Sequence, residues 1–162
     1  MTTTEGKISV RKITREDLPE VGAMAGELVR WHHSLDERRF MLVEEVEKGY
    51  ARFFESQMED PDVVLVIALL DEKPVGYAYA RLESRDWNLL LDAYGALHDI
   101  FVVKEARRTG VASALLDEVA GRLRALGAPR IVLSTAVQNE SAQRLFERHG
   151  FRSTMLEMTR EL

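Results

Sequence analysis

The stretch "DIFVVKEARRTGVASALLDEVAGRLRAL" (99–126) decides the fold, because it passes from an apolar run through a basic loop into a long amphipathic segment. Residues 94–103 are rich in apolar and aromatic side chains and predict a strand. After Gly110, apolar residues recur at intervals of three and four to the end of the stretch, which predicts a helix. Arg107 and Arg108 therefore lie where a strand leads into a helix.

The rest of the chain predicts alternating strands and helices around this junction. The expected strands are 8–14, 62–70, 75–83, 94–103, 130–136 and 151–162, and the expected helices are 15–34, 43–58, 111–126 and 140–149. A turn is expected at 71–74, and 84–92 is expected to be a loop with room for a short helical turn. This order implies a mixed α/β sheet with helices on both faces, in one domain that spans 1–162.

Composition excludes several classes of function. Lys and Arg number 22 and Asp and Glu 27, so the net charge of −5 argues against a general nucleic-acid binder. The chain has no cysteine, hence no disulfide or cysteine-based zinc site, and its four histidines lack metal-ligand spacing, so no metal is expected. No apolar run approaches the roughly 18 residues of a membrane span. We expect a cytoplasmic protein that does not contact membranes.

The strand-to-helix junction has the parts of an anion-binding site. A helix that begins near Gly110 presents unpaired N–H groups and the positive end of its dipole, and Arg107 and Arg108 add positive charge. The two familiar phosphate loops, GxxxxGK[ST] and GxGxxG, are absent from the sequence. From these residues alone, two interpretations stay open: a phosphate site, or a helix start with solvated arginines.

Two motifs carry a resemblance to a known family. Residues 107–112, "RRTGVA", resemble the [RQ]xxGx[GA] signature of the GNAT acetyltransferase superfamily. About thirty residues later, "TAVQNESAQRLFERHGF" (135–151) resembles the second block of that family, NxxAxxL[YF]xxxGF. The order of predicted elements matches over essentially the whole chain. The resemblance implies a single GNAT-like domain with a mixed, mostly antiparallel sheet.

The resemblance further implies acetyl-CoA as the donor, with the pyrophosphate at the junction and the pantetheine arm along the strand before it. The residues it assigns to the donor are Ile100, Phe101 and Val102 on the strand, Arg107, Arg108, Thr109, Gly110, Val111, Ala112 and Ser113 in the loop and helix start, and Asn139, Ser141 and Phe146 beyond. For Asn139 a plain helix-capping role is an alternative, and the two roles are compatible.

Direct acetyl transfer requires a base, because only a neutral amine can attack a thioester. The local sequence is most similar to diamine (spermidine/spermine) acetyltransferases, whose "LEDFFV" strand aligns with "LHDIFV" (97–102). His98 then occupies the place of their active-site glutamate, and Asp99 matches the following aspartate. Histidine side chains in general titrate near neutrality, so His98 is our candidate base, the alternative being a histidine packed in the sheet. Both side chains can serve one site only if the strand is bulged or splayed.

The other side-chain assignments rest on the same resemblance. Phe146 falls where the family usually carries a tyrosine that protonates the thiolate, and Tyr77, Tyr79 and Tyr94 are candidate substitutes. Residues between the first two helices commonly line the acceptor pocket in this family, and a tryptophan precedes the 94–103 strand. The candidates for holding a cationic acceptor are Trp31, His33, Asp36, Glu37 and Trp87, each with a packing or solvated role as the alternative.

These observations predict an N-acetyltransferase that acts on a primary amine of a small molecule, such as a polyamine, an aminoglycoside or an amino acid. Protein N-termini and lysines are further candidate acceptors. Because Phe146 removes the usual acid, the alternative is an acyl-CoA-binding regulatory domain with little or no turnover. A third candidate is a phosphate-binding module unrelated to coenzyme A. The resemblance also implies a homodimer, with residues 151–162 as a pairing strand.

Overall fold

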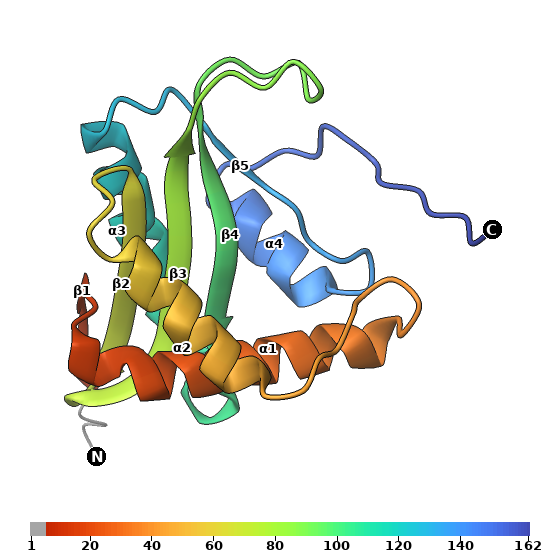
Figure 1. Cartoon of the computed structure of the whole chain (residues 1–162). Helices are drawn as coiled ribbons and strands as arrows, with labels where there is room; N and C mark the ends of the chain where they lie inside the picture. Colours follow the sequence, from red (N-terminus) through yellow and green to blue (C-terminus); the bar gives the residue numbers. More distant parts are fainter. Residues whose placement is uncertain (1–5) are drawn as a thin grey trace.

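The protein is described here by a computed structural model over residues 6–162, which form one five-stranded sheet with helices on both faces (Figure 1). The strands follow one another across the sheet in the order β1-β2-β3-β4-β5. β1 to β4 pair antiparallel, and β5 pairs parallel with β4. The predicted mixed, mostly antiparallel α/β fold is therefore confirmed.

The elements of the structure have the following bounds. The strands are β1 Ile8–Lys12, β2 Val63–Leu70, β3 Lys73–Glu83, β4 Tyr94–Val102 and β5 Ile131–Leu133. The helices are α1 Leu18–Leu35, α2 Val46–Gln57, α3 Val111–Ala125 and α4 Glu140–Arg148, with short 3-10 turns η1 Arg15–Asp17 and η2 Lys104–Ala106.

The sheet is buried on both faces, and the alternation of side chains along β2 shows how. Val64, Val66 and Ala68 point toward the face covered by α3 and α4, where they join one apolar cluster. Leu65 and Ile67 point to the other face and pack with α1 and α2 in a second cluster. Because successive strand residues face opposite sides, a strand buried on both faces is apolar throughout, as β2 is.

The β3 strand shows the same alternation with a different chemistry on each face. Gly76, Ala78 and Ala80 are small and lie on the face that α3 covers. A Cβ atom added to Gly76 would lie 2.7 Å from the carbonyl oxygen of Phe101, so this position has room only for glycine. Tyr77 and Tyr79, the residues between them, have long side chains with polar ends, and these side chains point toward α2.

The β4 strand is irregular where the candidate base lies. Tyr79 of β3 pairs with Asp99, but the next residue, Ala80, pairs with Leu97. His98 is thus the extra residue of a β-bulge, which bends the strand and reorients its side chains. On the other side, β5 pairs with β4 only as far as Leu97. The second half of β4 is therefore open at its β5 edge.

The prediction of a final strand over 151–162 is wrong. These residues form no strand and leave the body as a tail (Figure 1), with Met155 and Leu156 more than 80% exposed. An extended segment becomes a strand only when a neighbour satisfies its backbone N–H and C=O groups. The predicted neighbouring strand, β5, spans only three residues instead of 130–136, and the tail does not pair with it in this chain.

Other boundaries differ by a few residues. The first helix of the predicted 15–34 begins as the turn η1, whose Thr14 and Asp17 form a capping box. Segment 84–92 extends the β3–β4 hairpin through a bridge between Asp86 and Leu91. Among residues 6–162, no helix is long and apolar enough to cross a membrane. The cytoplasmic location stays a prediction.

Candidate active site

A cavity of about 310 Å³ opens beside the bulge of β4. Its walls come from α2, β3 and β4. The lining residues are Tyr50, Phe53, Tyr79, Arg81, Glu83, His98 and Asp99. Both candidate catalytic residues therefore border one cavity, which a regular strand would not allow for neighbouring positions. The bulge at His98 provides the irregularity that a shared site requires.

The Asp99 carboxyl lies at the inner side of this cavity. The hydroxyl of Tyr77, a fully buried side chain, donates a hydrogen bond of 3.0 Å to its Oδ2. Burial raises the pKa of Asp99, and the Tyr77 hydrogen bond and the nearby His98 oppose that shift. Burial together with the Asp99 charge also raises the pKa of Tyr50 to about 12. The cavity thus combines a carboxyl and phenols in a partly dehydrated setting.

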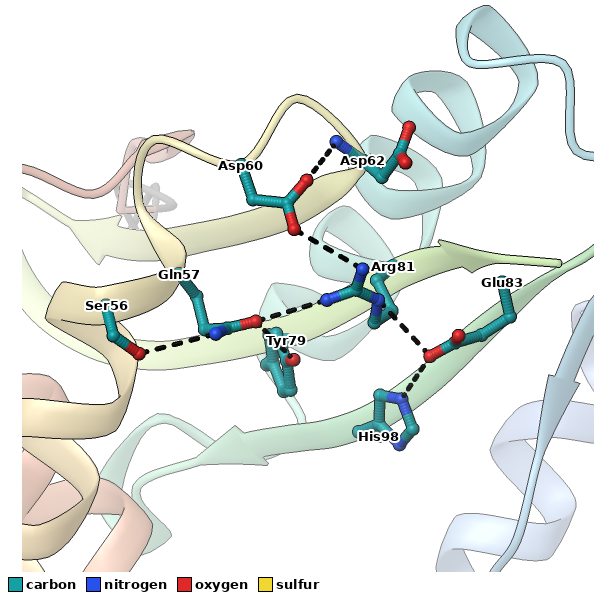
Figure 2. Close-up of polar contacts among 8 residues, drawn as sticks. All are labelled: Ser56, Gln57, Asp60, Asp62, Tyr79, Arg81, Glu83 and His98. Carbon is teal, nitrogen blue, oxygen red and sulfur yellow. Dashed lines mark hydrogen bonds and ion pairs between the residues drawn. The ribbon is translucent and has the colours of Figure 1, made fainter.

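His98 lies at the mouth, with nearly half of its side chain exposed. Its ring stacks on that of Tyr79, with centroids 5.4 Å apart and planes 25° from parallel. Its Nε2 is 3.7 Å from Oε1 of Glu83 (Figure 2). Glu83 in turn contacts Arg81, whose Nε lies 3.2 Å from the same oxygen. His98 therefore faces the carboxylate of Glu83, which itself forms an ion pair with Arg81.

The donor side of the site is the open edge of β4. The amide of Val103 donates to the carbonyl of Val75 in β3, so the alternating backbone groups of Ile100 and Val102 face the other way, toward the gap that β5 leaves. The carbonyl of Val102 already accepts a hydrogen bond of 3.2 Å from Nε of Arg107. The edge therefore offers an extended ligand the main-chain groups of Ile100 and the amide of Val102, whereas the main-chain groups of Phe101 face β3.

The junction loop fits a pyrophosphate. The first intrahelical bond of α3 runs from the amide of Ala114 to the carbonyl of Gly110, so the amides of residues 111–113 precede the ladder, and no side chain caps the helix. Gly110 has a φ of +90°, and a Cβ there would meet only Ile8, at 3.7 Å. Arg107 and Arg108 are exposed beside this opening. Unpaired amides, open space and positive charge together suit the pyrophosphate of acetyl-CoA.

Several residues assigned to the donor site also stabilise the fold. Asn139 caps α4, its Oδ1 accepting from the amide of Ala142 at 3.2 Å, which confirms the capping role. Ser141 donates to the same oxygen at 3.4 Å. Phe146 is buried against Phe151 in the core on the α3 side. The side chain of Val111 is also buried there.

The remaining residues of the helix start differ from one another in their surroundings. Thr109 donates through its hydroxyl to the carbonyl of Ala106, inside the loop. Ala112 is partly exposed on α3. Ser113 Oγ lies 3.0 Å from Nε2 of His149, at the end of α4. The helix start is thereby fastened to α4.

The five residues proposed for the acceptor do not border the cavity. Asp36 ends α1, and its Oδ1 accepts from the amides of nearby residues in its own loop. His33 Nδ1 contacts the carbonyl of Phe40 at 2.7 Å. Trp31 packs edge-on against His32, and Glu37 is exposed. Trp87 is 75% exposed near the tip of the β3–β4 hairpin.

Four residues that the sequence reasoning missed belong to the cavity. Arg81 and Glu83 line it with Tyr50 and Phe53. Arg81 and Glu83 could have been found from the alternation in "YAYARLE" (77–83), where every second side chain has a polar end. Because every second residue of a strand lies on the same face, these side chains share one face of the strand. Tyr50 and Phe53 require knowledge of how α2 packs on β3, which no local pattern supplies.

The candidate proton donors to the thiolate are poorly exposed. Tyr77 is fully buried, and Tyr79 and Tyr94 are 6% and 8% exposed. Burial raises the pKa of each of the three phenols. Within residues 6–162, no group of three or more histidine or acidic side chains is arranged to hold a metal ion.

The chain matches known acetyltransferases in sequence pattern and in fold. Residues 28–151 match the model of the Acetyltransferase (GNAT) family. Comparison with curated protein sequences finds no match. Among solved structures, the chain is similar to aminoglycoside N-acetyltransferase AAC(6')-Iy in complex with CoA, with 17% identity, a TM-score of 0.80, and 100% of this chain and 99% of that chain covered.

Two other solved structures are similar over nearly their full length. A probable acetyltransferase has 26% identity and a TM-score of 0.69, with 96% of each chain covered. A transcriptional regulator from Bacillus halodurans C-125 has 21% identity and a TM-score of 0.74, with 96% of this chain and 100% of that chain covered. The match of residues 28–151 to the family model confirms the family indicated by the two motifs. The chain belongs to the acetyltransferase (GNAT) family and is an acetyl-CoA-dependent N-acetyltransferase.

Proposed function

We propose that the protein acetylates a primary amine of a small cationic molecule by direct transfer, with His98 as the general base. The observation that carries this proposal is the bulge, which turns His98 and Asp99 to one cavity next to the open edge of β4. The base and the donor strand are then adjacent, as a single-step transfer requires.

The chemistry assigns a role to each of the two residues. Acetyl-CoA supplies the acetyl group as an activated thioester. The acceptor nitrogen forms a bond to the carbonyl carbon as the carbon–sulfur bond breaks, its proton passes to His98, and the thiolate leaves and takes a proton from solvent. Asp99 holds the acceptor, since Oδ2 accepts from Tyr77 and leaves Oδ1 for an ammonium group.

The cavity favours a cationic acceptor. Asp99 contributes a carboxyl group, and Tyr50, Phe53 and Tyr79 contribute aromatic faces that attract cations. The aminoglycoside N-acetyltransferase with a similar fold supports aminoglycosides as one candidate class. Polyamines and amino acids remain candidates from the sequence, and the diamine preference stays a prediction.

A thiol-release assay with acetyl-CoA tests the proposal on a panel of polyamines, aminoglycosides, amino acids and peptides. We expect release with at least one small cationic amine. His98→Ala should lower kcat by roughly 100- to 10,000-fold while leaving the affinity for acetyl-CoA unchanged. Wild-type turnover by His98→Ala between about pH 6 and 9 rules out His98 as the base. Stabilisation by acetyl-CoA without thiol release across the panel favours the regulatory alternative.

We also propose a homodimer formed through the C-terminal tail. Met155, Leu156 and Met158 are 84%, 83% and 89% exposed, and β5 ends the sheet. A tail from a second copy could extend that edge and bury these side chains. Light scattering should give twice the chain mass, and a variant truncated after Phe151 should be a monomer. A monomeric full-length chain contradicts this proposal.

A further inference from the structure

We propose that Glu83, held in place by Arg81, is the positioning residue that orients His98 for proton transfer. This inference rests on the proposed function, because it gives His98 the role of base. Glu83 lies at the end of β3, outside both family motifs, and only the pairing of β3 with β4 brings it to the site.

Arg81 is fixed by contacts with its neighbours. Its Nη1 donates to Oε1 of Gln57 at 3.2 Å, and its Nη2 donates to Oδ2 of Asp60 at 3.3 Å (Figure 2). The remaining nitrogen, Nε, lies 3.2 Å from Oε1 of Glu83. A planar guanidinium held on three sides has little freedom, so it fixes the position of the Glu83 carboxylate.

The same oxygen of Glu83 faces His98. The separation from Nε2 is 3.7 Å, longer than a hydrogen bond, and both groups are partly open to solvent, since the side chains of Glu83 and His98 are 32% and 46% exposed. Stacking on Tyr79 restricts the orientation of the imidazole plane. A shift of less than about 1 Å closes the gap, and such contacts commonly tighten when substrates bind.

The Glu83 carboxylate determines which imidazole nitrogen carries the proton. A neutral imidazole carries one N–H, and a carboxylate facing Nε2 favours that nitrogen as the donor. Nδ1 then keeps its lone pair and takes the proton from the acceptor amine. Glu83 therefore acts on His98 without contacting the acceptor.

Arg81 does not cancel the charge of Glu83 completely, since it shares its own charge with Asp60. The other groups that face His98 are Tyr79 on the adjacent strand and Asp99 in the next position along β4. Nε2 of His98 has its ion-pair contact with Glu83 alone among the described residues 6–162, so the orienting contact belongs to Glu83.

The test compares Glu83→Gln and Glu83→Leu with Glu118→Gln as a matched control. Glu118 also pairs with an arginine, and its side chain is 35% exposed, close to the 32% of Glu83. With spermidine and kanamycin as the acceptors, we expect both Glu83 variants to lower kcat by roughly 10- to 100-fold, less than loss of the base itself. KM for acetyl-CoA should not change, and the control should match the wild type.

A double-mutant cycle shows whether Glu83 acts through His98. In the His98→Ala background, Glu83→Gln should have no further effect on turnover. An equal fold-loss in both backgrounds overturns the inference, as does a wild-type kcat in Glu83→Gln. Urea unfolding of each variant separates these outcomes from loss of the fold, and the amide introduced by Glu83→Gln keeps an oxygen that can accept from Arg81.

A measurement without an acceptor distinguishes failure of the inference from failure of the proposed function. In protein labelled with nitrogen-15 histidine and bound to acetyl-CoA, we expect a proton signal at Nε2 of His98 that exchanges slowly with water. Glu83→Leu should remove it, and Glu118→Gln should not. Its absence from the wild type, or its persistence in Glu83→Leu, overturns the inference. If the signal behaves as expected but His98→Ala retains full turnover, only the proposed base is wrong.

Discussion

The Tyr77 hydroxyl donates a hydrogen bond of 3.0 Å to Oδ2 of Asp99, and so joins the buried core to the wall of the cavity. Tyr77 is fully buried between the sheet and the helices α1 and α2. The position of the Asp99 carboxyl is therefore set by core packing. The rigidity of this end of the site follows from the close packing of the core.

We expect Tyr77→Phe to destabilise the protein by about 1–2 kcal/mol, because a buried carboxyl loses its hydrogen-bond donor. The hydrogen bond lowers the pKa of Asp99 against the effect of burial, so its loss should raise that pKa further. Urea unfolding and a carboxyl-carbon NMR titration of Asp99 measure the two effects. Tyr50→Phe is the control, since it leaves the Tyr77 bond in place. A lower pKa of Asp99 in Tyr77→Phe contradicts this account.

The raised pKa of Asp99 predicts a pH-dependent stability. Because burial holds this pKa above the unfolded value near 3.8, the folded state binds the proton more tightly than the unfolded state between the two values. The stability contribution is complete below the unfolded pKa and is lost as pH rises through the folded pKa.

Asp99→Asn, which is neutral at every pH, should lack this loss. The free energy of unfolding of this variant should rise relative to that of the wild type as pH rises from about 4. The difference between the two free energies should become constant once Asp99 is ionised in both the folded and the unfolded state of the wild type. Urea unfolding of the variant and the wild type at a series of pH values measures this difference. A difference that shrinks with rising pH would mean that the carboxylate is stabilised in the fold.

Gly110→Asp should abolish most acetyl-CoA binding. The new carboxylate would lie beside the unpaired amides of α3 and repel the pyrophosphate, so we expect the Kd to rise at least roughly 30-fold, about 2 kcal/mol. Gly127→Asp is a matched control, with a φ of +93° against +90° at Gly110, and it lies beyond the other end of α3. Calorimetry with acetyl-CoA measures both. Equal affinity in Gly110→Asp and the wild type would exclude the junction as the pyrophosphate site.

Gly76→Ala should destabilise the protein by about 1–3 kcal/mol, because the added Cβ meets a backbone oxygen that cannot move independently. The distances are 2.7 Å to the carbonyl oxygen of Phe101 and 3.2 Å to Cδ1 of Leu115. Gly121→Ala, within α3 and with nothing within 4 Å, should instead stabilise by about 0.5–1 kcal/mol. Thermal unfolding should show Tm shifts of opposite sign. A neutral Gly76→Ala would mean that β3 and β4 can separate slightly.

Local patterns predicted the parts of this protein that depend on neighbouring residues. The apolar run of β2 and the helical spacing of α3 identify these elements because burial imposes a period on the sequence. Asn139 predicted the start of α4, where its side chain satisfies an amide three residues on. The junction at Gly110 was recognisable for the same reason, since the loop and the helix start adjoin in the chain.

Sequence patterns failed to predict the features that depend on contacts with distant parts of the chain. The strand expected over 151–162 does not form, because no neighbouring strand pairs with these residues in this chain. Trp31 and Trp87 suit a cation, but they lie outside the cavity. Conversely, Arg81 and Glu83 belong to no motif, and only the pairing of β3 with β4 sets Glu83 near His98.

By itself, the sequence determined the α/β order, the strand-to-helix junction at Gly110 and the family, because each depends on residues that are close along the chain. The tertiary structure decided whether His98 and Asp99 share a site, since that depends on one extra residue in β4 opposite β3. It also decided which side chains surround them, because α2, β3 and β4 meet there from distant parts of the chain. The register between strands, which no local pattern encodes, is the physical reason for the difference.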